Sequence, residues 1–375
     1  MKKIIKKVLS EKLRRKVLDF LNHLWVFICS HLRLKKRVLF YTVRENGALL
    51  ENARAVYDAL DTPKGVFAAK LPHTKLQKAK AYYLLLTNKV IVTDDYCRYL
   101  PYIKLRSGQS VVQIWHACGA FKKFGLDDTL SRFTPESERA FHSKYTFAVV
   151  TSEECRGIYA GAFGIDTNKC LPLGLPRTDR LVNDKENIKK EFIDRHPALK
   201  NKKIYLYAPT FREKDGEKRV FDPGIDFDAL SEELNEDEIF IVCRHPVMEY
   251  NILKKKYNNI IDLTGESVLR VLSISAALVT DYSSIVFDSS LMGVPCVFYC
   301  PDIEIYERGF YLKFPDDLPG KMITSPGEIL REARKAAENP DTEKISVFIK
   351  KYLSSCDGAA SKRVAGEIKK LWTLS

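Results

Sequence analysis

Short apolar runs alternate with amphipathic segments along most of the chain after Arg37. The runs predict buried β-strands, and the segments between them repeat apolar residues at helical spacing. The predicted strands span residues 38–43, 89–93, 111–115, 146–151, 204–208, 239–243, 260–263, 277–281 and 296–299. Helices are predicted at 50–60, 152–163, 285–292, 326–338, 342–353 and 360–372. This alternation is typical of an α/β fold, in which parallel sheets carry helices on both faces.

The strand pattern falls into two similar halves, and a length of 375 residues favours two domains. Residues 184–203 between the halves are polar and charged, as expected of a connection. We therefore predict two Rossmann-like domains facing across a cleft, one at residues 37–186 and the other at 187–375. The C-terminal helices are candidates to pack back on the N-terminal domain.

Positive charge is concentrated at the amino terminus. Twelve basic and two acidic residues lie between Met1 and Arg37, so this segment carries +10 of the chain's net charge of +13. Apolar residues recur through it at intervals of three and four, which predicts a basic amphipathic helix at residues 1–36 lying in an anionic membrane surface. The alternative is a helix packed on the protein with its basic face in solvent. Polar interruptions argue against a signal peptide, and charge this localised argues against a nucleic-acid partner.

The sequence argues against several kinds of site. Its nine cysteines are scattered with no CxxC pair, which indicates buried thiols in a reducing compartment and no structural metal. The GxxxxGK[ST], GxGxxG, GxSxG and HExxH patterns are missing from the sequence, so the nucleotide, hydrolase and zinc sites that they mark are not predicted. We interpret Asp226-Phe227-Asp228 as helix capping. No cofactor or metal is therefore predicted.

Polar clusters follow four of the predicted strands. His116 ends the strand at 111–115, where a neutral imidazole can accept a proton near pH 7. The clusters of the second half contain Thr210 and Arg212, Arg244 and His245, and Ser283 and Ser284. The two serines begin a predicted helix, whose amino end attracts anions, and arginines bind diphosphates well. Taken singly, each cluster has an ordinary structural alternative, such as a serine helix cap or a histidine bonded in a turn or the core.

Taken together, these clusters and several other segments resemble the CDP-glycerol glycerophosphotransferase family of teichoic acid synthesis. The matching segments, in the family's order, are 52–57, 115–116 with 122–125, 174–179, 208–212, 244–246, and 280–288 with 298–299. The resemblance implies a GT-B fold, a CDP-activated polyol phosphate donor, and catalysis without a required metal. The stretch Trp115 to Ala120 stands in place of the His-Gly-Thr-Pro type common in polymerases, and is similar to the primase branch.

The resemblance implies an acceptor-binding N-terminal domain and a CDP-donor-binding C-terminal domain. The implied reaction transfers glycerol phosphate from CDP-glycerol to a membrane lipid-linked (undecaprenyl-diphosphate) ManNAc-GlcNAc disaccharide, priming wall teichoic acid synthesis and releasing CMP. The expected catalytic residues are His116, the base, and His245, and the expected donor-binding residues are Thr210, Arg212, Arg244, Ser283, Ser284 and Asp288. Asp288 would accept hydrogen bonds from glycerol hydroxyls. Such a protein acts as a peripheral protein on the cytoplasmic face of the cell membrane.

Three other functions stay open at this point. One is a teichoic acid or capsule poly(polyol phosphate) polymerase that uses CDP-glycerol or CDP-ribitol. The second is a GT-B glycosyltransferase that uses a UDP-sugar, and the third is a non-catalytic protein that binds membrane surfaces. A homo-oligomer is also an open alternative.

Overall fold

The chain forms two compact units. The computed structural model describes residues 11–131, 133–214, 217–219, 221–244, 248 and 251–374. Unit 1 comprises Met1–His116, Arg139–Ala148 and Lys362–Ser375, and unit 2 comprises Ala117–Glu138 and Val149–Ser361. The predicted division at residues 186 and 187 stays a prediction.

The first sheet belongs largely to unit 1 and has six strands in the order β2-β1-β3-β4-β5-β6. Its pairs from β2 to β5 are parallel. Its strands are β1 (Lys35–Thr42), β2 (Lys64–Ala68), β3 (Asn88–Thr93), β4 (Ser110–Gln113), β5 (Phe147–Val149) and β6 (Cys170–Leu171). Every residue of β3 is buried, because a central parallel strand is covered on both faces.

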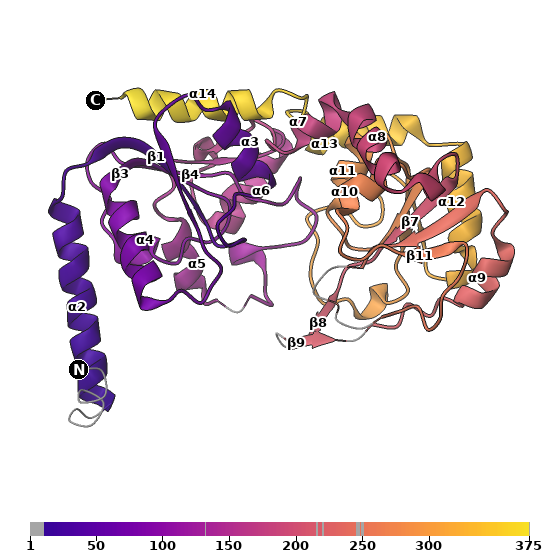
Figure 1. Ribbon diagram of the computed structural model, residues 1–375, viewed down its shortest axis with the longest axis horizontal. Coiled ribbons are helices and arrows are strands. Elements are labelled where there is room, and N and C mark those ends of the chain that lie inside the picture. The colour runs from indigo at the N-terminus through magenta and orange to yellow at the C-terminus, as the bar shows by residue number, and fades with distance from the viewer. Residues whose placement is uncertain are drawn as a thin grey trace. The chain divides into compact units, whose positions relative to one another are not determined.

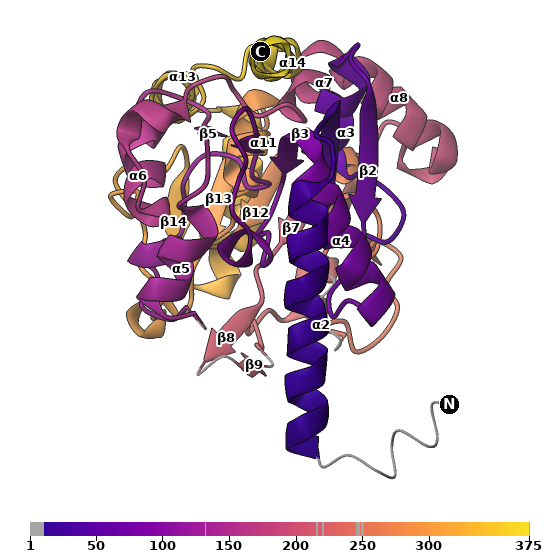
Figure 2. The same cartoon turned by 90° about the vertical axis from the view of Figure 1, so that its left-hand side faces the viewer.

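Helix α2 (Glu11–His31) lies beside α4 (Lys75–Thr87) in unit 1. The Trp25 indole N–H on α2 donates to the Ala79 carbonyl at 2.9 Å. In both views the amino-terminal part of α2 extends past α4 (Figures 1 and 2). The other helices before the second sheet are α3 (Glu51–Ala59), α5 (Pro135–His142), α6 (Glu154–Phe163), α7 (Thr178–Asn183) and α8 (Lys185–Arg195). Helix α2 therefore has one part packed on unit 1 and one part beyond it.

The second sheet lies in unit 2 and has six parallel strands in the order β11-β10-β7-β12-β13-β14. Its strands are β7 (Lys203–Ala208), β10 (Glu238–Val242), β11 (Ile260–Asp262), β12 (Ala277–Thr280), β13 (Cys296–Tyr299) and β14 (Lys321–Ile323). The accompanying helices are α9 (Phe227–Glu233), α10 (Val268–Leu272), α11 (Ile285–Leu291), α12 (Ile329–Glu338) and α13 (Thr342–Tyr352). A hairpin of β8 (Arg212–Lys214) and β9 (Glu217–Arg219) and the C-terminal α14 (Ala360–Thr373) complete the chain.

The predicted α/β architecture is confirmed, and each of the nine predicted strands overlaps an observed one. Asp226 caps α9, as predicted, because its carboxylate accepts the backbone N–H groups of Asp228 and Ala229. The analysis missed β2, β6, β14 and the β8–β9 hairpin, since all are short and β2 contains a glycine. Among the described residues, no helix has both the length and the apolar character needed to cross a bilayer.

Candidate active site

Three of the predicted polar clusters meet at one edge of the second sheet. Strands β10, β7 and β12 are neighbours, and their carboxyl ends lead into Arg244, Thr210 and Ser283 respectively. Carboxyl ends of parallel strands open on the same edge of a sheet, which is where α/β proteins bind their ligands. The structure thus gathers in unit 2 residues that lie far apart in the sequence.

Asp281 joins the clusters that follow β7 and β12. Its carboxylate accepts the Thr210 backbone N–H at 2.9 and 3.1 Å and the Thr210 hydroxyl at 2.9 Å. Arg212 Nη1 donates to Asp281 Oδ2 at 2.8 Å, while its Nε and Nη2 donate to the Asp302 carboxylate at 2.6 and 3.0 Å. We call Thr210, Arg212, Asp281 and Asp302 the unit 2 edge cluster. Its charges are paired inside the protein.

Burial and aromatic rings surround the Arg212 guanidinium. It lies 4.1 Å from the centroid of the Phe221 ring and 5.0 Å from that of Tyr282. Burial lowers the pKa of Arg212, but the carboxylates of Asp281 and Asp302 outweigh it and hold the pKa above its ordinary value. Arg212 is therefore a permanent cation whose Nε, Nη1 and Nη2 donate to protein acceptors.

The two predicted serines stand at the start of α11 and are half-buried. Ser283 Oγ accepts the Ile285 backbone N–H at 3.4 Å. Ser284 is the N-cap residue, yet its side chain makes no capping hydrogen bond. An ordinary serine cap therefore does not account for Ser284.

Asp288 lies on α11, buried in an ion pair with Arg177. Arg177 Nη1 and Nη2 donate to the two Asp288 carboxylate oxygens at 2.7 and 3.0 Å, and the Arg177 and Asp288 side chains are 9% and 5% exposed. This pair ties α11 to the turn before α7. The predicted contact between Asp288 and glycerol hydroxyls stays a prediction.

Arg244 is bound to the end of β11. Its Nη2 donates to Asp262 Oδ2 at 3.1 Å, and its backbone N–H donates to the Thr264 hydroxyl at 3.0 Å. Its Nη1 donates to the Met248 carbonyl at 3.2 Å. His245, the second predicted catalytic residue, lies outside the described residues.

Lys122 is a charged neighbour of the unit 2 edge cluster that the sequence analysis quoted only as part of a motif. Its segment pairs with residues 309–311, since Lys123 N–H donates to Gly309 O at 2.8 Å and Tyr311 N–H to Phe121 O at 2.9 Å. The charged groups acting on its ammonium include Arg308, Asp281 and Arg212. Burial, helped by the charge of Arg308, lowers the pKa of Lys122 to about 8. The signal available in the sequence was a lysine six residues after the strand-end His116.

His116 lies in unit 1, after β4. Its Nδ1 is 3.0 Å from the Asp94 backbone carbonyl. A carbonyl only accepts, so Nδ1 carries the hydrogen and the lone pair of the neutral ring is on Nε2. The ring stacks on Trp115 with centroids 4.4 Å apart, and Asn52 Nδ2 donates to the Trp115 carbonyl at 3.0 Å. These contacts fix the orientation of the His116 ring, and its role as a base stays a prediction.

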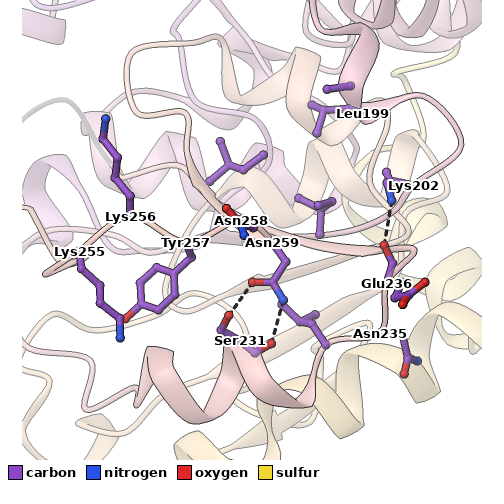
Figure 3. Close-up of a pocket in the computed structure, with 14 residues that line it drawn as sticks. Leu199, Lys202, Ser231, Asn235, Glu236, Lys255, Lys256, Tyr257, Asn258 and Asn259 are labelled. Atoms are coloured by element: carbon purple, nitrogen blue, oxygen red, sulfur yellow. Dashed lines mark hydrogen bonds between the residues drawn. The ribbon is translucent and has the colours of Figure 1, made fainter.

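A recess of about 700 Å³ lies at the opposite edge of the second sheet. Its lining includes Lys202, Asn235 and Asn259, which precede β7, β10 and β11 at their amino ends. The polar groups there bond one another: Ser231 Oγ donates to Asn259 Oδ1 at 2.6 Å, and Lys202 to the Glu236 carbonyl at 2.8 Å (Figure 3). The recess contains none of the predicted site residues.

Known proteins match the chain over most of its length. Residues 24–370 match the family model described as CDP-Glycerol:Poly(glycerophosphate) glycerophosphotransferase. The teichoic acid ribitol-phosphate primase of Bacillus spizizenii is 34% identical over 360 residues, 90% of this chain and 92% of that protein. The teichoic acid glycerol-phosphate primase of Bacillus subtilis is 32% identical over 299 residues, 78% of this chain and 76% of that protein.

A polymerase relative is matched over a smaller share of its length. The teichoic acid poly(ribitol-phosphate) polymerase of Bacillus spizizenii is 32% identical over 295 residues, which cover 76% of this chain but 47% of that protein. The solved structure of the wall teichoic acid polymerase TagF aligns with a TM-score of 0.77 at 22% identity, over 97% of this chain and 99% of that chain. This likeness confirms the predicted fold class.

Proposed function

Because the chain belongs to the CDP-glycerol:poly(glycerophosphate) glycerophosphotransferase family, we propose that it adds the first polyol phosphate of a wall teichoic acid. It transfers glycerol phosphate from CDP-glycerol to an undecaprenyl-diphosphate-linked ManNAc-GlcNAc disaccharide and releases CMP. The observation that carries the proposal is the Lys122 ammonium and the hydroxyls of Ser283 and Ser284 beside the unit 2 edge cluster, since these groups can contact a diphosphate. Matches to two primases over most of their lengths support the priming role.

In the proposed reaction an acceptor hydroxyl oxygen attacks the β-phosphorus of CDP-glycerol. A new oxygen–phosphorus bond forms, the bond from that phosphorus to the CMP oxygen breaks, and His116 Nε2 takes the hydroxyl proton. The 3.0 Å contact of Nδ1 with the Asp94 carbonyl supports this role, because it leaves the basic lone pair on Nε2.

The residues of unit 2 have two proposed roles: some contact the donor diphosphate, and others keep the site in position. Lys122, Ser283, Ser284 and the proposed His245 would contact the diphosphate and balance charge on the departing CMP. The Nε, Nη1 and Nη2 groups of Arg212 already donate to protein acceptors, so it serves the donor site by fixing Thr210 and Asp281. Arg244, bound to Asp262, would border the donor in the same way.

Ribitol phosphate is a second candidate for the transferred group. The 34% identity to a ribitol-phosphate primase extends over 90% of this chain and 92% of that protein. CDP-ribitol and CDP-glycerol share the cytidine and diphosphate, so the sites described in unit 2 serve both. The length of the polyol distinguishes the two donors.

The amino-terminal segment 1–36 would bind the anionic cytoplasmic leaflet, where a lipid-linked acceptor resides. Helix α2 exposes large apolar side chains, among them Phe20 at 66% and Phe27 at 61%. Exposed apolar residues on a basic helix favour insertion into a headgroup layer. Replacing Phe20 and Phe27 by Ser should reduce transfer to acceptor in anionic vesicles but not to a soluble acceptor. Equal activity of variant and parent on vesicles would contradict this role.

The function is tested by incubating the purified protein with radiolabelled CDP-glycerol, or CDP-ribitol, and the lipid-linked disaccharide, and sizing the product. One added unit is expected, and the preferred donor identifies the polyol. A ladder of products would contradict the primase activity and indicate a polymerase. Transfer from a UDP-sugar alone would overturn the donor class.

A further inference from the structure

Three residues of unit 1 meet at the carboxyl edge of the first sheet. Arg44 follows β1, Asp94 follows β3 and His116 follows β4, and these three strands are neighbours. The register places Tyr41 beside Thr93 and Thr93 beside Gln113, so the three strands end at the same level of the sheet. We call Arg44, Asp94 and His116 the unit 1 edge cluster.

The Asp94 carboxyl is buried and lacks a close hydrogen-bond partner among the described residues. The residue is 1% exposed, and neither carboxyl oxygen has a close donor in the part of the chain that the structure describes. Burial raises the pKa of Asp94 to about 6, although a weaker interaction with the Thr42 hydroxyl and the charge of Arg44 lower it. Folded proteins seldom leave a buried carboxyl unmatched, because its desolvation is costly.

Arg44 carries the complementary unmet group. Its Nη1 is buried and has no hydrogen-bond partner within the described part of the chain. Arg44 is close enough to Asp94 for its charge to act on the carboxyl, yet no ion pair joins the two described side chains. An unmet acceptor and an unmet donor therefore stand at one sheet edge. The backbone of Asp94 meanwhile accepts from the ring of His116.

We propose that Asp94 and Arg44 form a binding site for the hydroxyl groups of the acceptor. A hydroxyl donates one hydrogen bond and accepts others, so adjacent hydroxyls satisfy the carboxylate and the guanidinium together. Asp94 thereby contacts the acceptor with its side chain and orients the base with its main chain. This inference rests on the proposed function, because it assigns the acceptor that the reaction requires.

The same chemistry is offered by two acceptor ends. One is the ring of a terminal amino sugar, as in the unprimed disaccharide, and the other is a polyol, as in the disaccharide bearing one glycerol phosphate. Both present hydroxyl groups near one another. Comparing them shows which end the site takes.

The test measures binding of short-alkyl diphosphate ManNAc-GlcNAc, with and without one glycerol phosphate, to Asp94→Asn, Arg44→Gln and the parent protein by calorimetry. Hydrogen bonds to charged groups are worth about tenfold to a hundredfold in affinity, so Asp94→Asn should raise the acceptor Kd by about that much. The matched control is Asp95→Asn. Asp95 is half-buried and accepts the Tyr96 backbone N–H at 2.6 Å, so this change should leave the acceptor Kd unaltered.

Steady-state kinetics separate this site from a purely structural role. Asp94→Asn should raise the acceptor KM while the donor KM stays unchanged. Unchanged acceptor Kd and KM in both Asp94→Asn and Arg44→Gln would overturn the inference, as would a loss confined to kcat. If acceptor binding weakens in the variants but no CDP-polyol is consumed by the parent, the proposed function fails and the acceptor site stands.

Discussion

The edges of the two sheets treat their charges in opposite ways. In the unit 2 edge cluster, the Arg212 guanidinium is held by the carboxylates of Asp281 and Asp302. In the unit 1 edge cluster, Asp94 and Arg44 carry buried polar atoms that meet no partner among the described residues. The first arrangement is rigid before any ligand arrives, because its hydrogen bonds are already made. The second costs folding stability until a ligand supplies the missing partners, which is the usual trade between stability and function.

The largest effect is expected from His116→Ala, because His116 is the proposed catalytic residue of the unit 1 edge cluster. Positioned acid–base catalysis contributes about 10²–10⁴-fold, so His116→Ala should lower kcat by that factor. Donor binding, measured by calorimetry, should stay as in the parent, since the donor contacts are assigned to unit 2.

The matched control is His31→Ala, which removes an exposed imidazole whose sequence neighbours Phe27 and Ser30 supply its hydrogen bonds, at 2.8 and 3.2 Å. Its kcat on a soluble acceptor should equal that of the parent. Normal transfer by His116→Ala would remove the residue from the mechanism.

Arg212→Met tests whether Arg212 holds the unit 2 edge cluster together. Removing this cation leaves the buried Asp281 and the half-buried Asp302 carboxylates uncompensated, and breaking a buried pair typically costs about 3–5 kcal/mol. The free energy of unfolding in urea should fall by that amount. Arg54→Met, which removes an exposed ion pair with Asp58, should have no measurable effect. A variant Arg212→Met as stable as the parent would mean that the network is not a structural unit.

Asp94→Asn should act in the opposite direction on stability. The folded pKa of about 6 lies above the ordinary value of 3.8, so the unfolded chain loses its proton first as the pH rises. The contribution of Asp94 protonation to folding stability is therefore complete below about pH 4, declines as the pH rises through 6, and is lost above that value. Replacing the acid should therefore stabilise the protein at pH 8 by up to about 3 kcal/mol, and not at pH 4.

Unfolding of both proteins in urea across pH 4–8 measures this difference. Asp95→Asn, beside it, removes a charge that raises the pKa of Asp94, so it should move the decline toward lower pH without abolishing it. A variant Asp94→Asn that is less stable than the parent at pH 8 would show that the carboxylate has a structural partner.

The sequence allowed the sheets, and the positions at which strands end, to be predicted. Buried parallel strands are recognisable in the sequence as apolar runs. The polar residues that follow these runs include Thr210, Ser283 and His116. Pairing between strand ends was not predictable, because Arg212 and Asp302 are 90 residues apart and meet only through the strand order. Asp94 also follows a predicted strand. Its burial, and not its type, sets it apart, and burial depends on packing by distant segments.

Lys122→Met tests whether the Lys122 ammonium, beside the unit 2 edge cluster, contacts the donor diphosphate. The pKa of Lys122 near 8 means that its ammonium loses its proton as the pH rises through that value. If the ammonium contacts the diphosphate, donor affinity in the parent should fall about tenfold between pH 7 and pH 9. In Lys122→Met it should be weak and nearly independent of pH over that range, because the titrating group is gone. Lys123→Met, at the exposed neighbouring position, should keep the parent's affinity and pH profile. A donor Kd for Lys122→Met equal to the parent's at pH 7 would show that Lys122 serves packing, and would leave the serines and His245 to balance the diphosphate.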